Sequence, residues 1–290
     1  MMTRKFRTFA AVAVCFAVAG TGLTGCEDDG FASKKPDTFS GARKFTIEKK
    51  TVNVSCSGRR NGDAPVVVLL PGLGDGMDKM AAFQKTLSTK NRVCSYDRLG
   101  EGASSKPDAP QSFASTGKIL TGVIDEVAGD APVVLAGHSM GGLIAARYAP
   151  DHRGQVKGLV LMDATPSTML ADLKTAIPAS ATGPAAQLRA QNLAVFGGEN
   201  PERLATPDGK VRSAGNIPVE VIKHGKPYLV AVPGAGPRLE AAWTAGERRW
   251  LALSGRSRFT VAGKSGHYIY LEQPDVAVQA VERVSAQVAS

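Results

Sequence analysis

A serine at the centre of a glycine-flanked turn is the residue best suited to do chemistry in this chain. Residues 137–141 read Gly-His-Ser-Met-Gly, so that Ser139 is the central residue of a G-x-S-x-G pattern. The apolar run 132–136 predicts a buried strand before it, and residues 143–148 predict the start of a helix after it. On such a strand-to-helix turn the hydroxyl projects above the sheet, where it can attack an acyl carbon.

Four histidines could serve as the base for this serine, at positions 138, 152, 224 and 267. His267 follows the last predicted strand, residues 257–263, and a loop histidine there can turn its imidazole to the serine hydroxyl. His138 adjoins the serine, and neighbours on a tight turn point apart. His224, at the end of the preceding predicted strand, is the alternative. We therefore expect His267 to be the base.

Two further stretches complete a family resemblance. Residues 71–74, Pro-Gly-Leu-Gly, directly follow the buried strand predicted at 66–70, and residues 96–104 read Tyr-Asp-Arg-Leu-Gly-Glu-Gly-Ala-Ser. Together with the G-x-S-x-G turn and the late histidine, they resemble the α/β-hydrolase superfamily. The resemblance covers most of residues 43–289, apart from a lid insertion at about 166–215. It implies an α/β fold with a mostly parallel eight-stranded sheet, flanking helices and a small helical lid.

The resemblance also implies an oxyanion hole. The loop 71–74 would aim a backbone N–H at the oxygen that becomes negative during acyl transfer. Leu73 would supply this N–H, and Met140, the residue after the serine, would supply the second. A tight turn that only leads into the helix predicted at 77–89 is the alternative. Asp97 is expected to hold its loop, because it precedes the serine in the chain.

The acid that would orient His267 is harder to assign. Many members of the superfamily place it after the strand equivalent to 217–223, but the following residues here, His-Gly-Lys-Pro, contain no carboxylate. Asp163 ends the strand predicted before that one, which is an alternative acid position in the superfamily. It could instead cap the turn that enters the lid. Glu240 and Glu247 are reserve candidates, which the geometry of their predicted helix disfavours.

The first 25 residues resemble a bacterial lipoprotein signal peptide. Basic residues precede a mostly apolar stretch, 8–23, which is too short to span a membrane, and Leu-Thr-Gly-Cys closes it at Cys26. Cys26 would carry lipid and hold the exported protein on the extracytoplasmic face of the membrane. A secretory peptide that is cut nearby is the alternative. Residues 26–42 are polar and predict a flexible tether, which leaves 43–290 as the hydrolase domain.

Two cysteines remain in the predicted domain, Cys56 and Cys94. In the strand order of the superfamily, 1-2-4-3-5-6-7-8, their strands are neighbours, so the resemblance makes a disulfide between them geometrically plausible. Export to an oxidising compartment favours the bond. Two buried free cysteines are the alternative.

Composition and charge exclude other classes of protein. The chain has a formal net charge of +9, but its basic residues are dispersed, whereas a nucleic-acid site needs them clustered on one element. The cysteines and histidines show no spacing typical of metal ligands. We therefore expect no metal, no cofactor and no nucleic-acid partner.

These features predict a serine hydrolase that cleaves a carboxylic ester through an acyl-enzyme on Ser139, with His267 and Asp163 completing the triad. The substrate would be a small or lipid-like acyl compound, as for carboxylesterases and lipases. A prolyl-type aminopeptidase or a thioesterase is the alternative among enzymes. A non-catalytic envelope lipoprotein with this fold is the alternative outside them.

Overall fold

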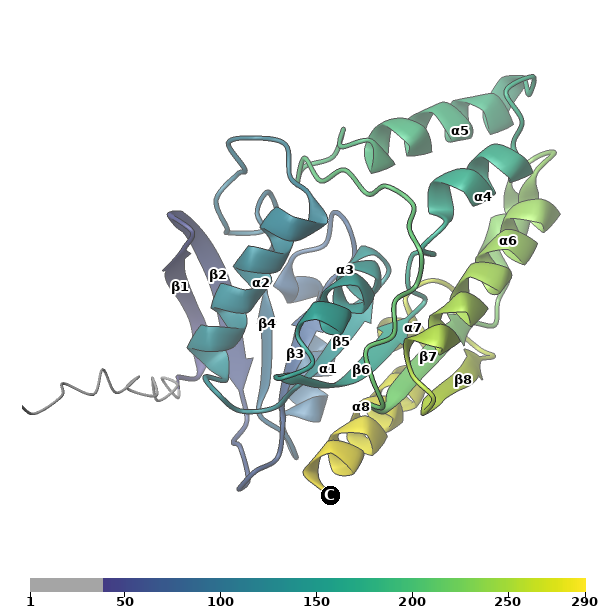
Figure 1. The fold of residues 1–290 in the computed structure, drawn as a ribbon. Coiled ribbons are helices and arrows are strands. Elements are labelled where there is room, and N and C mark those ends of the chain that lie inside the picture. The colour runs from purple at the N-terminus through teal and green to yellow at the C-terminus, as the bar shows by residue number, and fades with distance from the viewer. Residues whose placement is uncertain (1–38) are drawn as a thin grey trace, which may run out of the picture. The chain divides into compact units, whose positions relative to one another are not determined.

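An eight-stranded sheet in the order β1-β2-β4-β3-β5-β6-β7-β8 forms the centre of the fold (Figure 1). The computed structural model describes residues 39–290, so the predicted signal peptide, Cys26 and most of the tether lie outside the described residues. β2 pairs antiparallel with β1 and β4, and the other neighbours are parallel. The strands are β1 (Gly41–Ile47), β2 (Lys50–Ser57), β3 (Val66–Leu70), β4 (Val93–Tyr96), β5 (Val133–His138), β6 (Val156–Met162), β7 (Val219–His224) and β8 (Ser257–Ala262).

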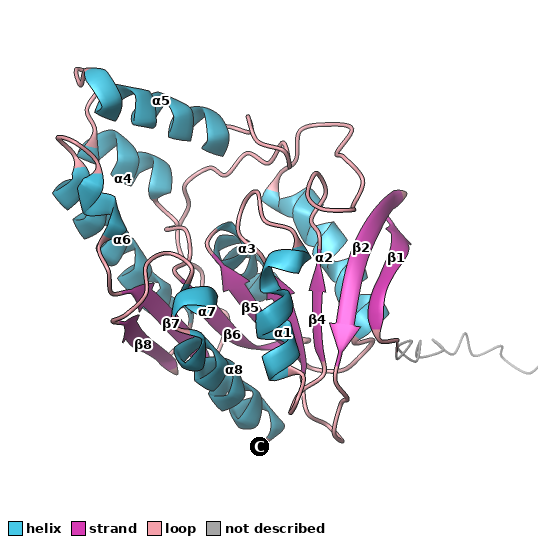
Figure 2. Ribbon diagram, turned by 180° about the vertical axis from the view of Figure 1, so that it is seen from behind, coloured by secondary structure: helices cyan, strands magenta, loops and turns pink. Residues whose placement is uncertain are grey.

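Helices cover both faces of this sheet (Figures 1 and 2). α2 and α3 pack on one face, and α1 and α8 pack on the other. The central strands are apolar without alternation, as in the run Val-Val-Val-Leu-Leu of β3, because a parallel strand with helices on both sides has no polar face. The helices are α1 (Ala81–Leu87), α2 (Phe113–Val127), α3 (Met140–Tyr148), α4 (Met169–Ala176), α5 (Gly183–Phe196), α6 (Gly236–Arg249), α7 (Ile269–Glu272) and α8 (Pro274–Ala289).

The fold prediction is confirmed: the sheet, the flanking helices and the strand order are those expected. The segment predicted as a lid, 166–215, contains α4 and α5 and no strand. Leu173 and Ile177, from α4 and its C-terminal cap, pack with Leu239 of α6 in a separate apolar cluster. These helices lie beyond the carboxyl ends of the central strands (Figure 1).

The predicted disulfide is present between Cys56 and Cys94. The two residues face each other in the antiparallel register of β2 and β4, and both are fully buried. The bond therefore joins the antiparallel edge of the sheet to its parallel centre.

Three strand ends bring the predicted catalytic residues to one edge of the sheet. Ser139 follows β5 directly, Asp163 follows β6 directly, and His267 lies in the loop after β8. In parallel sheets, ligands bind at the carboxyl ends of the strands, because the following loops meet there. Within residues 39–290, no helix combines the length and the apolar character that crossing a lipid bilayer requires.

Candidate active site

Ser139 occupies the strained turn between β5 and α3. Its backbone has φ 51° and ψ −118°, values that residues other than glycine rarely adopt. The turn is tight enough that a Cβ at Gly137 would lie 2.5 Å from the backbone carbon of Gly141. A Cβ at Gly141 would lie 2.2 Å from the carbonyl oxygen of Leu70, at the end of β3. Glycine is therefore required at both positions of the pattern.

The loop 71–74 packs directly on this turn. A Cβ at Gly72 would lie 2.9 Å from Nδ1 of His138, which immediately precedes the serine. Met140 is the first residue of α3, so its N–H has no acceptor within the helix. Among the described residues, no acceptor takes up the N–H of Leu73. Two unpaired donors therefore lie in the two segments that pack together at the serine.

A buried arginine holds the loop in place. Arg98 donates to the carbonyl oxygens of Pro71, at 2.6 Å, and Gly72, at 2.8 Å. Its guanidinium also forms a bidentate salt bridge with the carboxylate of Glu202, with N–O distances of 2.8 and 2.6 Å, and both side chains are buried. Glu202 comes from the lid segment and was not predicted. The loop 71–74 is thus connected to the lid segment through one ion pair.

Asp163 is fully buried and accepts hydrogen bonds on both carboxylate oxygens. His224 donates to Oδ1 from its backbone N–H, at 3.2 Å, and from Nδ1, at 2.7 Å. Trp243 Nε1 donates to the same oxygen at 3.0 Å, and His267 Nδ1 donates to Oδ2 at 2.6 Å. Burial alone would raise the pKa of Asp163, but the hydrogen bonds from the two histidines outweigh it and hold that pKa below its usual range.

His267 is oriented by this carboxylate. Since Nδ1 donates its proton to Asp163, the neutral imidazole leaves Nε2 unprotonated and able to accept a proton. The hydroxyl of Tyr228 lies 3.2 Å from Nδ1 and also donates to Asp163 at 3.4 Å. His138 Nε2 donates to the carbonyl oxygen of His267 at 2.9 Å, and burial lowers the pKa of His138 to about 3. His138 is therefore a neutral structural residue.

Ser139 and His267 both line a cavity of about 250 Å³ beneath the lid. The serine Oγ lies 3.5 Å from Oγ1 of Thr165, and among the described residues it has no hydrogen bond with His267. Nucleophile and base commonly tighten their contact only when substrate binds. Apolar side chains form most of the remaining wall: Pro166, Met169, Leu173, Phe196, Leu229, Leu239, Ala242 and Trp243.

The alternative residues weighed in the sequence lie elsewhere in the network. His224 is buried between Asp163 and Glu240 and does not line the cavity. Glu240 bonds Lys223 and His224, and Glu247 has no hydrogen-bond partner among the described residues. Neither glutamate contacts His267. The roles of Trp243, Tyr228 and Thr165 were not predicted, because no local pattern indicates them.

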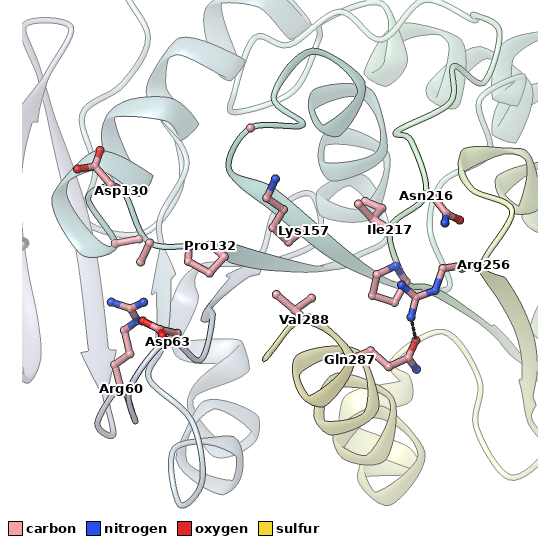
Figure 3. Close-up of a pocket in the computed structure, with 14 residues that line it drawn as sticks. Arg60, Asp63, Asp130, Pro132, Lys157, Asn216, Ile217, Arg256, Gln287 and Val288 are labelled. Atoms are coloured by element: carbon pink, nitrogen blue, oxygen red, sulfur yellow. Dashed lines mark hydrogen bonds between the residues drawn. The ribbon is translucent and has the colours of Figure 1, made fainter. Parts of the chain in front are cut away.

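A larger cavity, about 780 Å³, lies at the amino ends of the central strands, opposite the ends that Ser139 and Asp163 follow (Figure 3). Pro132 and Ile217, which precede β5 and β7, form part of its wall, together with Lys157 and Arg256. It contains no serine, cysteine or histidine, so it lacks the residue types that the predicted acyl transfer requires. No cluster of metal-ligating side chains occurs in the part of the chain that the structure describes.

Comparison with known proteins bears on the fold of this chain. The sequence model of the alpha/beta hydrolase fold family matches residues 65–206. The human (lyso)-N-acylphosphatidylethanolamine lipase is 29% identical over 119 residues, which cover 40% of this chain and 34% of that protein. The chain spans about a third of the length of such curated relatives.

Two solved structures illustrate the shared fold. The enol-lactonase from Burkholderia xenovorans superposes with a TM-score of 0.60 at 19% identity, over 84% of this chain and 100% of that one. The carboxylesterase CesB from Bacillus subtilis superposes with a TM-score of 0.60 at 18% identity, over 85% of this chain and 91% of that one. The chain has the α/β-hydrolase fold, and the curated relatives that it matches in part include a lipase.

Proposed function

We propose that this chain is a serine hydrolase that cleaves carboxylic esters through an acyl-enzyme on Ser139. The observation that carries the proposal is the 2.6 Å hydrogen bond from His267 to the buried Asp163, made at the wall of the cavity that Ser139 also lines. This arrangement supports Ser139 as nucleophile, His267 as base and Asp163 as the acid that orients the base.

The reaction would proceed in two acyl-transfer steps. His267 Nε2 takes the proton of Ser139 as Oγ attacks the acyl carbon, and the N–H groups of Leu73 and Met140 stabilise the oxyanion. Asp163 stabilises the imidazolium, which returns its proton to the departing alcohol. A water molecule then attacks the acyl-enzyme with His267 again as base, and the acid is released.

The cavity favours a neutral acyl group of limited length. Its one carboxylate, Asp172, is bonded to Arg249 at 3.1 Å and to Thr168 at 2.6 Å. A volume of about 250 Å³ holds about eight groups the size of water, at ~30 Å³ each. We therefore propose esters with short acyl groups as the preferred substrates.

A fluorophosphonate probe and a panel of chromogenic substrates test the proposal. The wild-type protein should react with the probe and hydrolyse short acyl esters, whereas Ser139→Ala should do neither. Ser167→Ala is a matched control, because this serine lies at the start of the lid segment and outside the cavity lining.

Other results would identify a different activity. Faster cleavage of aminoacyl amides or of thioesters than of oxygen esters would indicate a prolyl-type aminopeptidase or a thioesterase. Failure of the folded wild-type protein to react with the probe would indicate a non-catalytic binding protein, and would overturn the proposal.

We also propose that the protein is exported and anchored by lipid on Cys26. The basis is the sequence of residues 1–26, which lies outside the described residues. Cys26→Ser should move the protein from the membrane fraction to the soluble fraction. An unmodified Cys26 in the native protein, detected by mass spectrometry, would contradict this anchor.

A further inference from the structure

A second histidine is bonded to the proposed catalytic acid. His224, the last residue of β7, is fully buried, and its Nδ1 lies 2.7 Å from Oδ1 of Asp163. On the other side of the ring, Nε2 lies 2.8 Å from Oε1 of Glu240 in α6. The proposed acyl-transfer steps do not use this residue.

The contacts of His224 with two carboxylates determine whether its imidazole ring is charged. An ionised carboxylate only accepts hydrogen bonds, and a neutral imidazole donates from one nitrogen only. Lys223 Nζ lies 2.9 Å from Oε1 of Glu240, which favours the ionised form of that carboxylate. Since both nitrogens of His224 face carboxylates, both must carry protons if both bonds are to form.

We propose that His224 is an imidazolium held between Asp163 and Glu240, and that it is a positioning residue for the catalytic acid. It occupies Oδ1 of Asp163 with two donors, so that Oδ2 faces His267. The charge state follows from the geometry alone, and the effect on catalysis rests on the proposed function.

The surrounding charges support a cationic His224. Asp163 and Glu240 supply two negative charges, and Lys223 supplies one positive charge. Tyr228 and Glu247 add no charge. Burial raises the pKa of both groups, and the negative charge of Asp163 raises both pKa values further, so both groups stay protonated. With a cationic His224, the two positive and two negative charges of these four side chains cancel. His267 is not counted, because it donates to the other oxygen of Asp163. A neutral His224 would leave one buried negative charge uncompensated, which is costly.

The cation should persist at neutral pH. Burial alone would lower the pKa of His224, but the hydrogen bonds and charges of Asp163 and Glu240 outweigh it and raise that pKa above its ordinary value. A raised histidine pKa means that the charge is present at low pH and is lost as pH rises through it. Activity should therefore decline on the alkaline side as His224 loses its proton.

Steady-state kinetics with a short-chain chromogenic ester test the positioning role. His224→Gln should lower kcat by about 10- to 100-fold with little change in KM, and should remove the alkaline decline. Glu240→Gln should move that decline lower by about one pH unit, because it removes an opposite charge from His224. Glu247→Gln is the matched control on the same helix, and its profile should coincide with that of the wild type. A folded His224→Gln protein with wild-type kcat would overturn the role, as would an unmoved decline in Glu240→Gln.

The charge state can be measured without turnover. Nitrogen-15 NMR of the histidine rings in Ser139→Ala should show both nitrogens of His224 protonated at neutral pH. An unprotonated Nε2, accepting from Lys223 Nζ at 3.2 Å, would overturn the inference. Lack of esterase activity would instead remove the proposed function and leave this measurement interpretable. If His224→Gln fails to fold, the Glu240→Gln profile and the NMR spectrum still decide.

Discussion

At the scale of single residues, Asp163 combines a strained backbone with a dense set of hydrogen bonds. Its φ is 45°, in the left-handed region, and its carboxylate accepts from His224, Trp243 and His267. Asparagine adopts this backbone readily, so Asp163→Asn should keep the fold. The amide has one acceptor oxygen in place of two and carries no negative charge, so it cannot accept from both histidines and cannot stabilise the cation of His267 as a carboxylate does. We therefore expect kcat to fall on the order of 10⁴-fold.

Circular dichroism and thermal melting would verify that the Asp163→Asn protein is folded before its kinetics are measured. A loss of less than about tenfold would mean that another carboxylate orients His267. Glu240 would then be the first to examine, because it is linked to Asp163 through His224.

Glu247 gives a stability prediction with a defined pH dependence. Burial and the nearby charge of Asp163 raise its pKa well above 4.5, and its oxygens have no hydrogen-bond partner among the described residues. The unfolded chain releases this proton above pH 4.5 while the folded chain keeps it, so stability is lost as pH rises toward the folded pKa. Glu247→Gln removes the penalty, and should raise Tm at about pH 8 while changing it little at about pH 4. Equal changes at both values, measured by calorimetry, would contradict this account.

The sequence indicated the candidate site residues that follow strand ends, but it did not indicate the side chains that contact them. Ser139 has a local pattern, and the resemblance to the superfamily indicated His267 and Asp163, which follow predicted strands, as candidates. His224 reaches Asp163 because β7 pairs with β6, and Trp243 reaches it because α6 packs beside β7. Such a contact between distant segments leaves no periodic pattern in either one.

At the scale of elements, the loop 71–74, which would form the proposed oxyanion hole, is held by the ion pair between Arg98 and Glu202. Both side chains are buried, and Arg98 also bonds the carbonyl oxygens of Pro71 and Gly72. Glu202→Gln would leave a buried guanidinium without its counter-charge, which should cost about 3–5 kcal/mol of stability. The loosened loop should also lower kcat, by up to about 10²-fold. Urea unfolding and steady-state kinetics measure the two effects.

A double variant separates the effect of this ion pair on the stability of the fold from its effect on the position of the loop 71–74. Replacing Arg98 and Glu202 together by Met and Leu removes both buried charges, and should recover much of the lost stability. It should not recover kcat, because the carbonyls of Pro71 and Gly72 would still lack their donor. Recovery of both quantities would show that the pair has no role in holding the loop.

The sequence predicted a helical lid at about 166–215, but not the bounds of its helices. α5 buries only Ala185 among its residues, so its sequence lacks the apolar stripe that marks a helix against a core. The central strands, by contrast, are continuous apolar runs whose order along the chain matched the fold. Glu202 lies in the lid segment, and the sequence offered no reason to pair it with Arg98.

At the scale of the whole molecule, the disulfide should contribute strongly to stability. Cys56 and Cys94 are separated by 38 residues, and closing such a loop stabilises the fold by about 4 kcal/mol in the chain-entropy model. Reduction should therefore lower Tm by about 10 °C, for a domain of this size. Scanning calorimetry with and without a reductant measures the change.

The paired variant Cys56→Ala/Cys94→Ala is the control for unrelated effects of the reductant. It should melt like the reduced protein and should not respond to reductant. Turnover below Tm should be unchanged, because neither cysteine lines the cavity of Ser139 and His267. Two thiols titrating in the unreduced, denatured domain would show that the bond is absent.

Trp243 gives the molecule an optical property. The chain has two tryptophans, and the other, Trp250, is buried in the core away from the cavity lining. The indole of Trp243 donates to Asp163, lies 5.8 Å from the ring of His267 and forms part of the cavity wall. Its fluorescence emission therefore depends on the contents of the cavity and on the charge of the neighbouring imidazole. Formation and breakdown of the proposed acyl-enzyme should therefore change the fluorescence of the unmodified protein, with Trp250 as a constant background.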